Sequence, residues 1–295
     1  MTPFLPEKLV IFDYSGTLSL EAPRFARPAN LLSALVESGL ARLGIATPET
    51  FWGEIVDPTW TEASTTSIGY KHIMAERIEA LGLAPGVAGA EIAAISSRFV
   101  DLYLAHSRID PLWRPLLENL AGNPGAYVVI ATDHYAEATE TIIRYLRSWN
   151  LPARKAGEKG EGTAPDSSVK NQGLSPPLFI ANSADIGFWK ADRRFWETIQ
   201  LQLAITAIRS ILIIDDFGFN KEQGDGYGER AQIGARQKET TASLQEIFQA
   251  SLTVIPFFLI SGDRDRKEAG AQRIAETVRQ IDRFLDSGDV TKNTT

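Results

Sequence analysis

The chain opens with a short apolar run that stops at an acidic residue. Residues 8–12 are apolar at every position after Lys8, Asp13 follows directly, and Gly16 lies just beyond. A run that is apolar throughout, not at every second position, predicts a strand buried on both faces of a parallel sheet. Ligands bind outside the carboxyl ends of such strands, so we expect Asp13 to lie where chemistry is done. The plain alternative is a strand followed by an Asx-type turn.

After this strand the apolar pattern changes its period. Apolar residues recur at helical spacing, and helices are predicted from Pro28, from Pro48 behind a Thr47 cap, and over about 67–81 and 91–104. No strand pattern interrupts this stretch. It therefore predicts an inserted all-helical unit, residues 21–107, and not a continuation of a strand–helix–strand rhythm.

Helices and strands alternate again after residue 108. Strands are predicted at 127–132, 178–181, 211–216 and 254–259, and helices at 112–120, 137–149, 193–203 and 267–285. This order predicts an α/β core of residues 1–20 and 108–295, with a parallel sheet covered by helices. Residues 152–177 are rich in Gly, Ser, Pro and Lys and predict a mobile insertion. The polar tail from Asp286 predicts a frayed end.

Composition narrows the range of functions. The 295 residues include no Cys and only three His, which argues against disulfides, thiol nucleophiles and thiolate or His-rich metal sites. The net charge of −7 argues against a nucleic-acid partner. The N-terminus lacks a signal-peptide pattern, and no apolar run approaches the ~18–20 residues that span a bilayer. We therefore expect a cytoplasmic protein without a membrane partner.

Several polar residues fall at or just after the predicted strand ends. They are a carboxylate, a hydroxyl, an amine and a pair of acids: Asp13, Thr132, Lys190, Asp215 and Asp216. The carboxyl ends of parallel strands meet at one edge of a sheet, so these groups form one candidate site. The plain alternatives are a solvated Lys190, a helix cap at Thr132 and a turn at the paired acids.

These residues resemble the motifs of the haloacid dehalogenase superfamily. Residues 13–17 read Asp-Tyr-Ser-Gly-Thr, similar to the family's Asp-x-Asp-Gly-Thr, with Ser15 replacing the second Asp. Residues 183–196 resemble its Ser-x-x-x-Gly-x-x-Lys-Pro-Asp-x-x-Phe run, with Ala191 in place of Pro. The resemblance implies a haloacid dehalogenase-like hydrolase: a Rossmann-like parallel sheet core with residues 21–107 as an inserted α-helical cap domain.

The resemblance and simple electrostatics suggest a metal site. A carboxylate would repel a phosphoryl group, and a hard divalent cation bound by oxygen ligands between them would remove this repulsion. We expect Mg²⁺ to be held by Asp13, Asp216 and the backbone carbonyl of Ser15. Asp215 is expected to be a further ligand or to support the ligands from behind.

The same resemblance suggests catalytic roles. Asp13 is expected to be the nucleophile that forms an aspartyl-phosphate. Lys190 is expected to neutralise the phosphate and hold Asp13, and Thr132 to donate its hydroxyl to a phosphate oxygen. Gly16, Thr17 and Asp133 are expected to bind the substrate by donating hydrogen bonds to its phosphate oxygens.

Ser15 is the main departure from the family pattern. In the family's phosphatases the second Asp protonates the leaving group and activates water, and serine has no accessible pKa for that work. Tyr14 and His134 are nearby candidates for a substitute. Asn220 stands where many relatives carry a further acid, and it could contact a metal-bound water. Lys71, in the helical unit, would be the Schiff-base lysine if the protein were a phosphonate hydrolase.

The sequence thus predicts a Mg²⁺-dependent phosphatase that acts on a small phosphorylated metabolite. Two alternatives stay open. Ser15 is compatible with a catalytically silent protein that binds a ligand or a protein partner, whereas the retained Asp13, Lys190 and Asp216 favour an enzyme. The other alternative is phosphonatase or dehalogenase chemistry, and the paired acids count against a metal-free dehalogenase.

Overall fold

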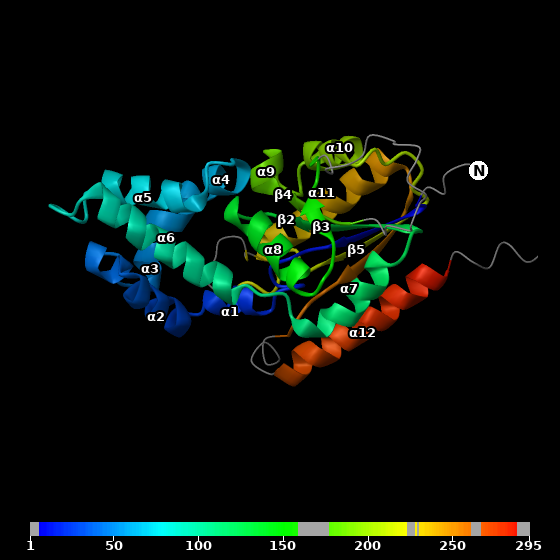
Figure 1. Ribbon diagram of the computed structural model, residues 1–295, viewed down its shortest axis with the longest axis horizontal. Helices are drawn as coiled ribbons and strands as arrows, with labels where there is room; N and C mark the ends of the chain where they lie inside the picture. Colours follow the sequence, from blue (N-terminus) through cyan, green and yellow to red (C-terminus); the bar gives the residue numbers. More distant parts are fainter. Residues whose placement is uncertain (1–5, 159–176, 223–227, 229, 261–266, 288–295) are drawn as a thin grey trace, which may run out of the picture.

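The computed structural model describes residues 6–158, 177–222, 228, 230–260 and 267–287. A six-stranded, all-parallel sheet with the order β3-β4-β2-β1-β5-β6 forms its centre (Figure 1). The strands are β1 (Lys8–Phe12), β2 (Ala126–Thr132), β3 (Ala153–Lys155), β4 (Leu178–Asn182), β5 (Ser210–Asp215) and β6 (Ser251–Pro256). The predicted α/β fold with a Rossmann-like parallel sheet is confirmed.

The helices fall into two groups along the chain. Before β2 the structure has α1 (Glu21–Phe25), α2 (Pro28–Ser38), η1 (Leu40–Leu43), α3 (Pro48–Thr50), the π-helical η2 (Phe51–Val56), α4 (Asp57–Thr65), α5 (Tyr70–Leu81), α6 (Gly89–His106), η3 (Pro111–Trp113) and α7 (Arg114–Ala121). After β2 it has α8 (Glu137–Ser148), α9 (Ser183–Ile186), α10 (Arg193–Gln202), α11 (Arg230–Phe248) and α12 (Lys267–Asp286).

The sheet is covered on both faces, which explains why its strands are apolar at successive positions. On β1, Val10 and Phe12 belong to one apolar cluster, which also holds residues of α7, α8 and α12. Leu9 and Ile11 belong to a second cluster, with residues of α10 and α11. In Figure 1, α7 and α12 accordingly lie on one side of the sheet and α10 and α11 on the other. Side chains of one strand thus alternate between two buried layers.

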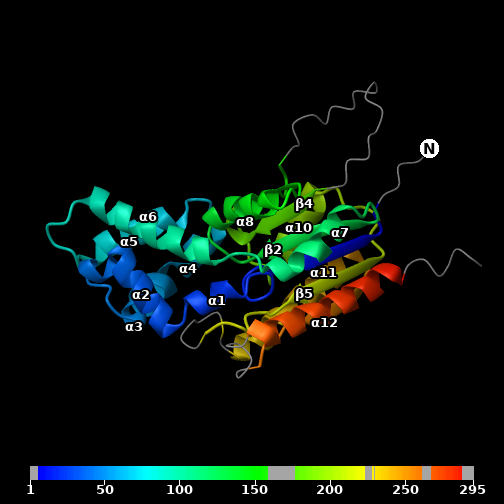
Figure 2. The ribbon, with the colours of Figure 1, turned by 60° about the horizontal axis from the view of Figure 1, so that its bottom comes forward.

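Helices α1–α6, here called the helical unit, extend from one end of the sheet (Figure 2). This stretch, which the structure describes throughout, contributes no strand. Its apolar core belongs to the same cluster as one face of the sheet. The two connections between the helical unit and the sheet are tied together, because the Tyr14 hydroxyl donates to the Ser107 carbonyl and the Asp110 N–H donates to the Leu18 carbonyl over 2.8 Å. The helical unit therefore begins and ends at one place.

Three elements differ from the sequence-based expectation. Strand β6 lies three residues before the predicted 254–259, because its first half includes the polar Ser251 and Thr253 and so extends beyond the apolar run. Strand β3 lies inside the segment predicted to be a loop; it has three residues, two of them Arg154 and Lys155, so it carries no apolar run. It is an edge strand, where charged side chains are common. The rest of that segment, from residue 159 to 176, and the tail from residue 288 lie outside the described residues. Helix α11 has a weakly patterned sequence, and its range was not predicted.

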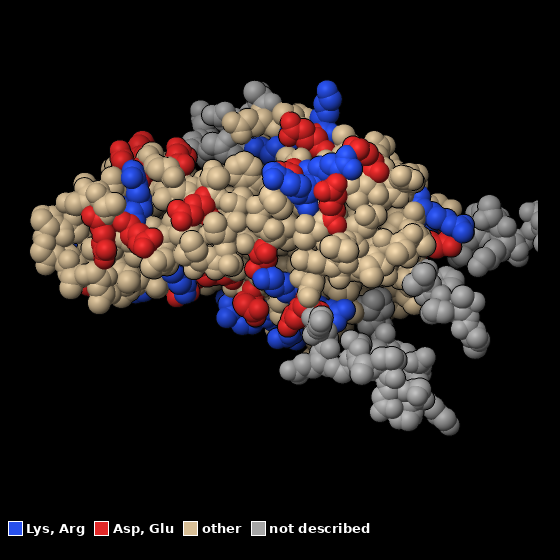
Figure 3. Space-filling view, turned by 90° about the horizontal axis from the view of Figure 1, so that it is seen from above, with Lys and Arg blue, Asp and Glu red and all other residues tan. Residues whose placement is uncertain are grey.

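The surface carries charges of both signs. On the face seen in Figure 3, acidic and basic side chains lie close together over the sheet, while much of the helical unit's surface is uncharged. Within the described ranges, no helix combines the length and the apolar character needed to cross a bilayer.

Candidate active site

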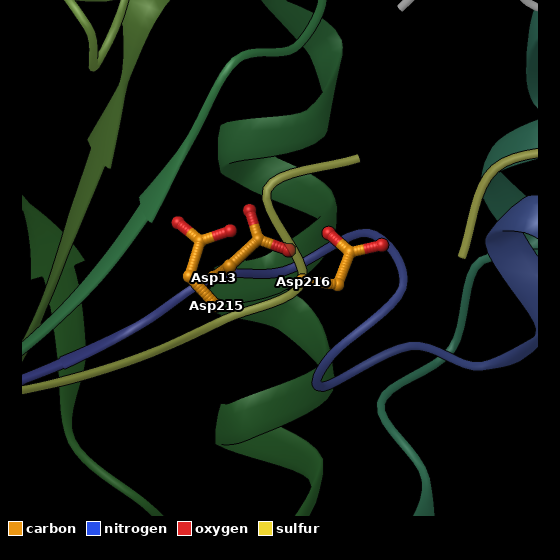
Figure 4. A group of neighbouring side chains, drawn as sticks. All are labelled: Asp13, Asp215 and Asp216. Carbon is orange, nitrogen blue, oxygen red and sulfur yellow. The ribbon is translucent and has the colours of Figure 1, made fainter. Parts of the chain in front are cut away.

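Three carboxylates converge where β1 and β5 end. Asp13 follows β1, Asp215 is the last residue of β5 and Asp216 comes next; one oxygen of each lies within 4.8 Å of the others. Figure 4 shows the three side chains in a row. The register explains this convergence, since Phe12 pairs with Ile214 and the Asp13 N–H donates to the Ile214 carbonyl over 2.8 Å. Strands β2, β4 and β3 lie on one side of β1, and β5 and β6 lie on the other. Parallel sheets bind ligands at the point where the strand order reverses in this way.

Lys190 joins two of these carboxylates. Its Nζ donates to Asp13 Oδ1 over 2.6 Å and to Asp215 Oδ2 over 2.8 Å, and all three side chains are buried. The lysine is held in place through its backbone: its N–H donates to Asp133 Oδ1 over 2.8 Å, and its carbonyl accepts from the Trp196 Nε1 over 2.7 Å. Lys190, which was predicted to hold Asp13, is thus in contact with it. Asp133, predicted to bind substrate, fixes the Lys190 backbone.

Two buried oxygens at this point lack hydrogen bonds. Asp13 Oδ2 and Thr132 Oγ1 have no partner in the part of the chain that the structure describes. Leaving a buried polar atom without a partner costs about 1–3 kcal/mol, so such atoms call for an explanation. A ligand that completes both would supply one. Asp13 and Thr132, which lies at the end of β2, can therefore each form a hydrogen bond or a covalent contact with a substrate.

Burial, with repulsion from neighbouring carboxylates, makes the paired acids harder to ionise. Burial raises the pKa of Asp215 to about 7; Lys190 opposes this shift, and Asp13 adds to it. Burial also raises the pKa of Asp216 to about 6, and Asp13 raises it further. A cation placed among these carboxylates would stabilise their ionised forms.

The turn after β1 is shaped to pack against Asp216. Gly16 has φ +101°, and a Cβ there would lie 2.4 Å from Asp216 Oδ2, so a side chain is excluded on both counts. The Thr17 hydroxyl accepts the Asp216 N–H over 3.2 Å. Asp216 in turn accepts the N–H groups of Gly218 and Asn220 at 3.0 and 2.8 Å. Gly16 and Thr17, predicted to bind substrate, thus orient Asp216.

Asn220 connects three backbone segments. Its Nδ2 donates to the carbonyls of Gly16 and Phe257, each over 2.7 Å, and its Oδ1 accepts the Leu259 N–H over 2.8 Å. The amide is buried and engaged at both ends. It stabilises the turn after β1 against the segment after β6, a role that the sequence did not suggest.

Lys221 is the functional candidate that the sequence analysis missed. Its Nζ donates to Ser15 Oγ over 2.6 Å, and its charge lowers the pKa of Asp216 against the larger effect of burial. An ammonium group therefore stands beside the position where the family's second Asp is replaced. Nothing in the spacing distinguishes this lysine from a surface one, so no sequence signal pointed to it.

The two substitutes proposed for the missing acid are held in other roles. The Tyr14 hydroxyl is bonded to the Ser107 carbonyl, and burial raises its pKa well above the usual value. Burial, reinforced by the charge of Lys221, lowers the pKa of His134 to about 3. The Tyr135 N–H donates to His134 Nδ1, so the ring proton belongs on Nε2, 2.9 Å from the Tyr103 hydroxyl. His134 is a neutral structural contact between the sheet and α6.

A cavity of about 710 Å³ lies between the helical unit and this site. Asp133, His134, Ala191 and Lys221 form its floor. Asp133 and Ala191 directly follow Thr132 and Lys190 in the chain, so the cavity adjoins the site, although Asp13, Thr132 and Lys190 are not among its lining residues. Its other lining residues are Ala22, Pro23, Phe25, Ala26, Leu31, Phe51, Trp52, Val56, Asp57, Trp60, Tyr70, Phe99, Val100, Tyr103, Tyr135, Trp189, Gln232, Ala235, Arg236 and Glu239. Lys71 is absent from this lining, and its Nζ pairs with Asp101 at 2.5 Å. The Schiff-base alternative thus lacks support from the cavity.

The comparisons with known proteins concern the fold. No family model matches the chain, and no curated protein does either. The chain is similar to the crystal structure of a 2-haloacid dehalogenase from Pseudomonas syringae pv. Tomato DC3000, with a TM-score of 0.43 and 17% sequence identity. The similarity covers 75% of this chain and 83% of that one.

Proposed function

We propose that the protein is a haloacid dehalogenase-like hydrolase that cleaves phosphate monoesters through a covalent intermediate on Asp13. The observation that carries this proposal is the pairing of Asp13 with Lys190. The ammonium holds Oδ1 at 2.6 Å, while Oδ2, on the same carboxylate, is buried without a hydrogen bond. A carboxylate with one oxygen fixed and one available is positioned to act as a nucleophile.

The reaction would proceed in two displacements. Asp13 Oδ2 forms a bond to phosphorus as the bond from phosphorus to the leaving oxygen breaks, which gives an aspartyl-phosphate and an oxyanion that takes its proton from water. Water then attacks phosphorus, releases phosphate and restores the carboxylate. Lys190 keeps Asp13 in place throughout, and the Thr132 hydroxyl, buried without a partner, donates to a phosphate oxygen.

The donor set suits a Mg²⁺ ion. Asp13 and Asp216, with the Ser15 carbonyl, would hold it, and Asp215 would support them through its link to Lys190. The clustered carboxylates and the raised pKa values of the two buried acids favour a cation at this point. When bound, the ion would supply charge neutralisation between the carboxylates and the phosphate.

The leaving oxygen meets a weak donor in this chain. The Ser15 hydroxyl accepts from Lys221, so its own proton is available for a hydrogen bond. A hydrogen bond from serine stabilises a departing oxygen less than proton transfer from a carboxylic acid does. Leaving groups that are stable as anions are therefore favoured.

The weak donor at Ser15 also supports dehalogenation as a second candidate, because a departing halide needs no proton. Both reactions use Asp13 as nucleophile, but they differ in where water attacks. It attacks phosphorus in a phosphoenzyme and the carboxylate carbon in an alkyl-enzyme ester. A single turnover in ¹⁸O-labelled water places the label in phosphate in the first case and in Asp13 in the second. Label found in Asp13 after turnover of a 2-haloacid would replace the phosphatase proposal.

Phosphate release from phenyl phosphate, with and without Mg²⁺, tests the proposal. Wild type should release phosphate only when Mg²⁺ is present, and Asp13→Asn should release almost none. Asp101→Asn, which changes an exposed carboxylate of the helical unit, is the matched control and should behave as wild type. Failure of wild type to turn over any phosphate monoester or haloacid would favour a silent binding protein.

A further inference from the structure

The cavity above the site is lined by aromatic rings to an unusual degree. Nine of its 24 lining residues are Phe, Trp or Tyr, although these residues make up 9% of the chain. Most of the nine belong to the helical unit, and Tyr135 and Trp189 belong to the sheet side. The cavity volume of about 710 Å³ lies within the ~300–1,000 Å³ that is typical of small-molecule sites, so it can hold an aromatic ring together with a phosphate group.

These rings form one connected wall from the floor outward. His134, on the floor, stacks on Tyr103 with a centroid distance of 5.4 Å. Tyr135 stacks on Tyr70 at 3.9 Å with their planes 14° apart, and the edge of Trp60 meets Tyr135 at 5.8 Å. A planar ligand packed against such a wall gains offset-stacked and edge-to-face contacts beyond simple burial.

Two of the rings that line the cavity, Tyr103 and Trp189, are held in place by hydrogen bonds. The Tyr103 hydroxyl lies 2.9 Å from His134 Nε2, and the Trp189 Nε1 donates to Ser64 Oγ over 2.8 Å. Rings that are already fixed lose little freedom when a ligand arrives, so the site is pre-organised.

The charged residues that line the cavity are Lys221, Arg236, Asp57, Asp133 and Glu239. Lys221 lies on the floor beside the site, where an anion would be bound. Leu31, Val56 and Val100 add aliphatic surface around the rings. Asp57, the acid of the helical unit in this lining, is exposed, so water screens its charge, which disfavours a quaternary ammonium ligand at this end of the cavity.

The replacement at position 15 points to the same ligand class independently. Without a carboxylic acid at Ser15, the leaving oxygen must depart largely as an anion. A phenol, with a pKa near ~10 as in the tyrosine side chain, does so far more readily than an aliphatic alcohol, whose pKa is close to the ~15.7 of water.

We infer that the substrate is an aryl phosphate monoester, with its aromatic ring against the Trp60–Tyr135–Tyr70 wall and its phenolic oxygen as the leaving atom. This inference rests on the proposed function for the phosphate and adds the class of the organic body. The aromatic wall can be tested separately from the phosphatase reaction, since it should also bind the dephosphorylated aromatic product.

Calorimetry with naphthol and kinetics with three phosphate esters test the inference. Wild type should bind naphthol, and Trp60→Leu should bind it about three- to tenfold more weakly. Trp149→Leu, the same replacement outside the cavity, should bind it as wild type does. In wild type, kcat/KM for phenyl phosphate should exceed that for benzyl phosphate at least about tenfold, although both carry the same ring. Phosphocholine should be a poorer substrate than phenyl phosphate.

The outcomes separate the two proposals. Equal naphthol affinity in wild type and Trp60→Leu, equal rates with phenyl and benzyl phosphate, or a preference for phosphocholine would overturn the aryl assignment while leaving a phosphatase. Trp60-dependent naphthol binding without turnover of any ester would overturn the proposed function while keeping the aromatic site.

Discussion

Lys221 donates a hydrogen bond from Nζ to Ser15 Oγ over 2.6 Å. The position that carries an acid in the family's phosphatases therefore carries a hydroxyl bonded to an ammonium. This pair places positive charge at the cavity floor, near enough to Asp216 to lower the pKa of that carboxyl. It distinguishes this site from the pattern that the sequence resembles.

Removing the charge of Lys221 should slow the first displacement. Lys221→Gln keeps a hydrogen-bond donor but not the ammonium, and we expect kcat/KM for phenyl phosphate to fall about 10- to 100-fold. Lys155→Gln removes a lysine that pairs with Asp185, away from the cavity lining, and serves as control. Equal losses in the two variants would show that Lys221 has no special place in the reaction.

Restoring an acid at position 15 should broaden the range of leaving groups. In Ser15→Asp the new carboxylate would face Lys221, whose charge offsets repulsion from Asp13. General acid–base help is typically worth ~10²–10⁴-fold, and we expect a gain of about tenfold or more with benzyl phosphate. The gain with phenyl phosphate should be smaller. A variant that loses activity with both esters would contradict this account of Ser15.

Glu137 attaches the helical unit to the sheet domain. Its carboxylate on α8 accepts the N–H groups of Tyr70 and Lys71 at the start of α5, each over 3.0 Å. Glu137→Ala should lower the free energy of unfolding by ~1 kcal/mol, as loss of a helix cap does, and speed hydrogen exchange of these amides. Glu140→Ala, at an exposed position of the same helix, should change neither. Unaltered exchange in Glu137→Ala would show that the contact does not hold α5.

The buried His134 should make stability depend on pH. Its folded-state pKa of about 3 lies below the unfolded value near ~6.5, so the unfolded state takes up a proton first as pH falls. His134 therefore leaves the free energy of unfolding almost unchanged well above pH ~6.5 and lowers it by about 2 kcal/mol at pH ~5.

Denaturant unfolding of wild type and His134→Gln at both pH values measures this cost. Wild type should lose about 2 kcal/mol more than the variant on going from pH ~7.5 to ~5. The raised pKa values of Asp215 and Asp216 act in the opposite direction, since the folded state then binds protons more readily, but they act in both proteins. Parallel pH profiles would rule out the neutral, buried state of His134.

Much of the fold could be predicted because its strands are buried on both faces. The run before Asp13 predicted β1 to the residue, and Thr132 and Asp215 lie at the ends of their strands as expected from apolar runs alone. Strand β3 could not be found, since a three-residue edge strand needs no apolar pattern. The start of α11 has no apolar periodicity either.

The site was predictable only as far as the topology of the sheet determines it. Strand ends meet at one edge, so the convergence of Asp13, Asp215 and Asp216 follows from strand order. The contacts of Lys221 and Asn220 depend on how the loop after β5 folds back on the turn at Gly16, which no residue pattern encodes. Most rings of the cavity lie in the helical unit, at positions that would suit an ordinary core equally well.

The central claim is that Asp13 accepts a phosphoryl group, and trapping the phosphoenzyme tests it most directly. Wild type and Asp13→Asn are mixed with phenyl phosphate and Mg²⁺, quenched in acid and reduced with borohydride, which converts an acyl phosphate of Asp into homoserine. Peptide mapping should find homoserine at position 13 in wild type and none in Asp13→Asn. Phenol release by wild type with unmodified Asp13 under these conditions, or homoserine at Asp215 or Asp216, would contradict the account.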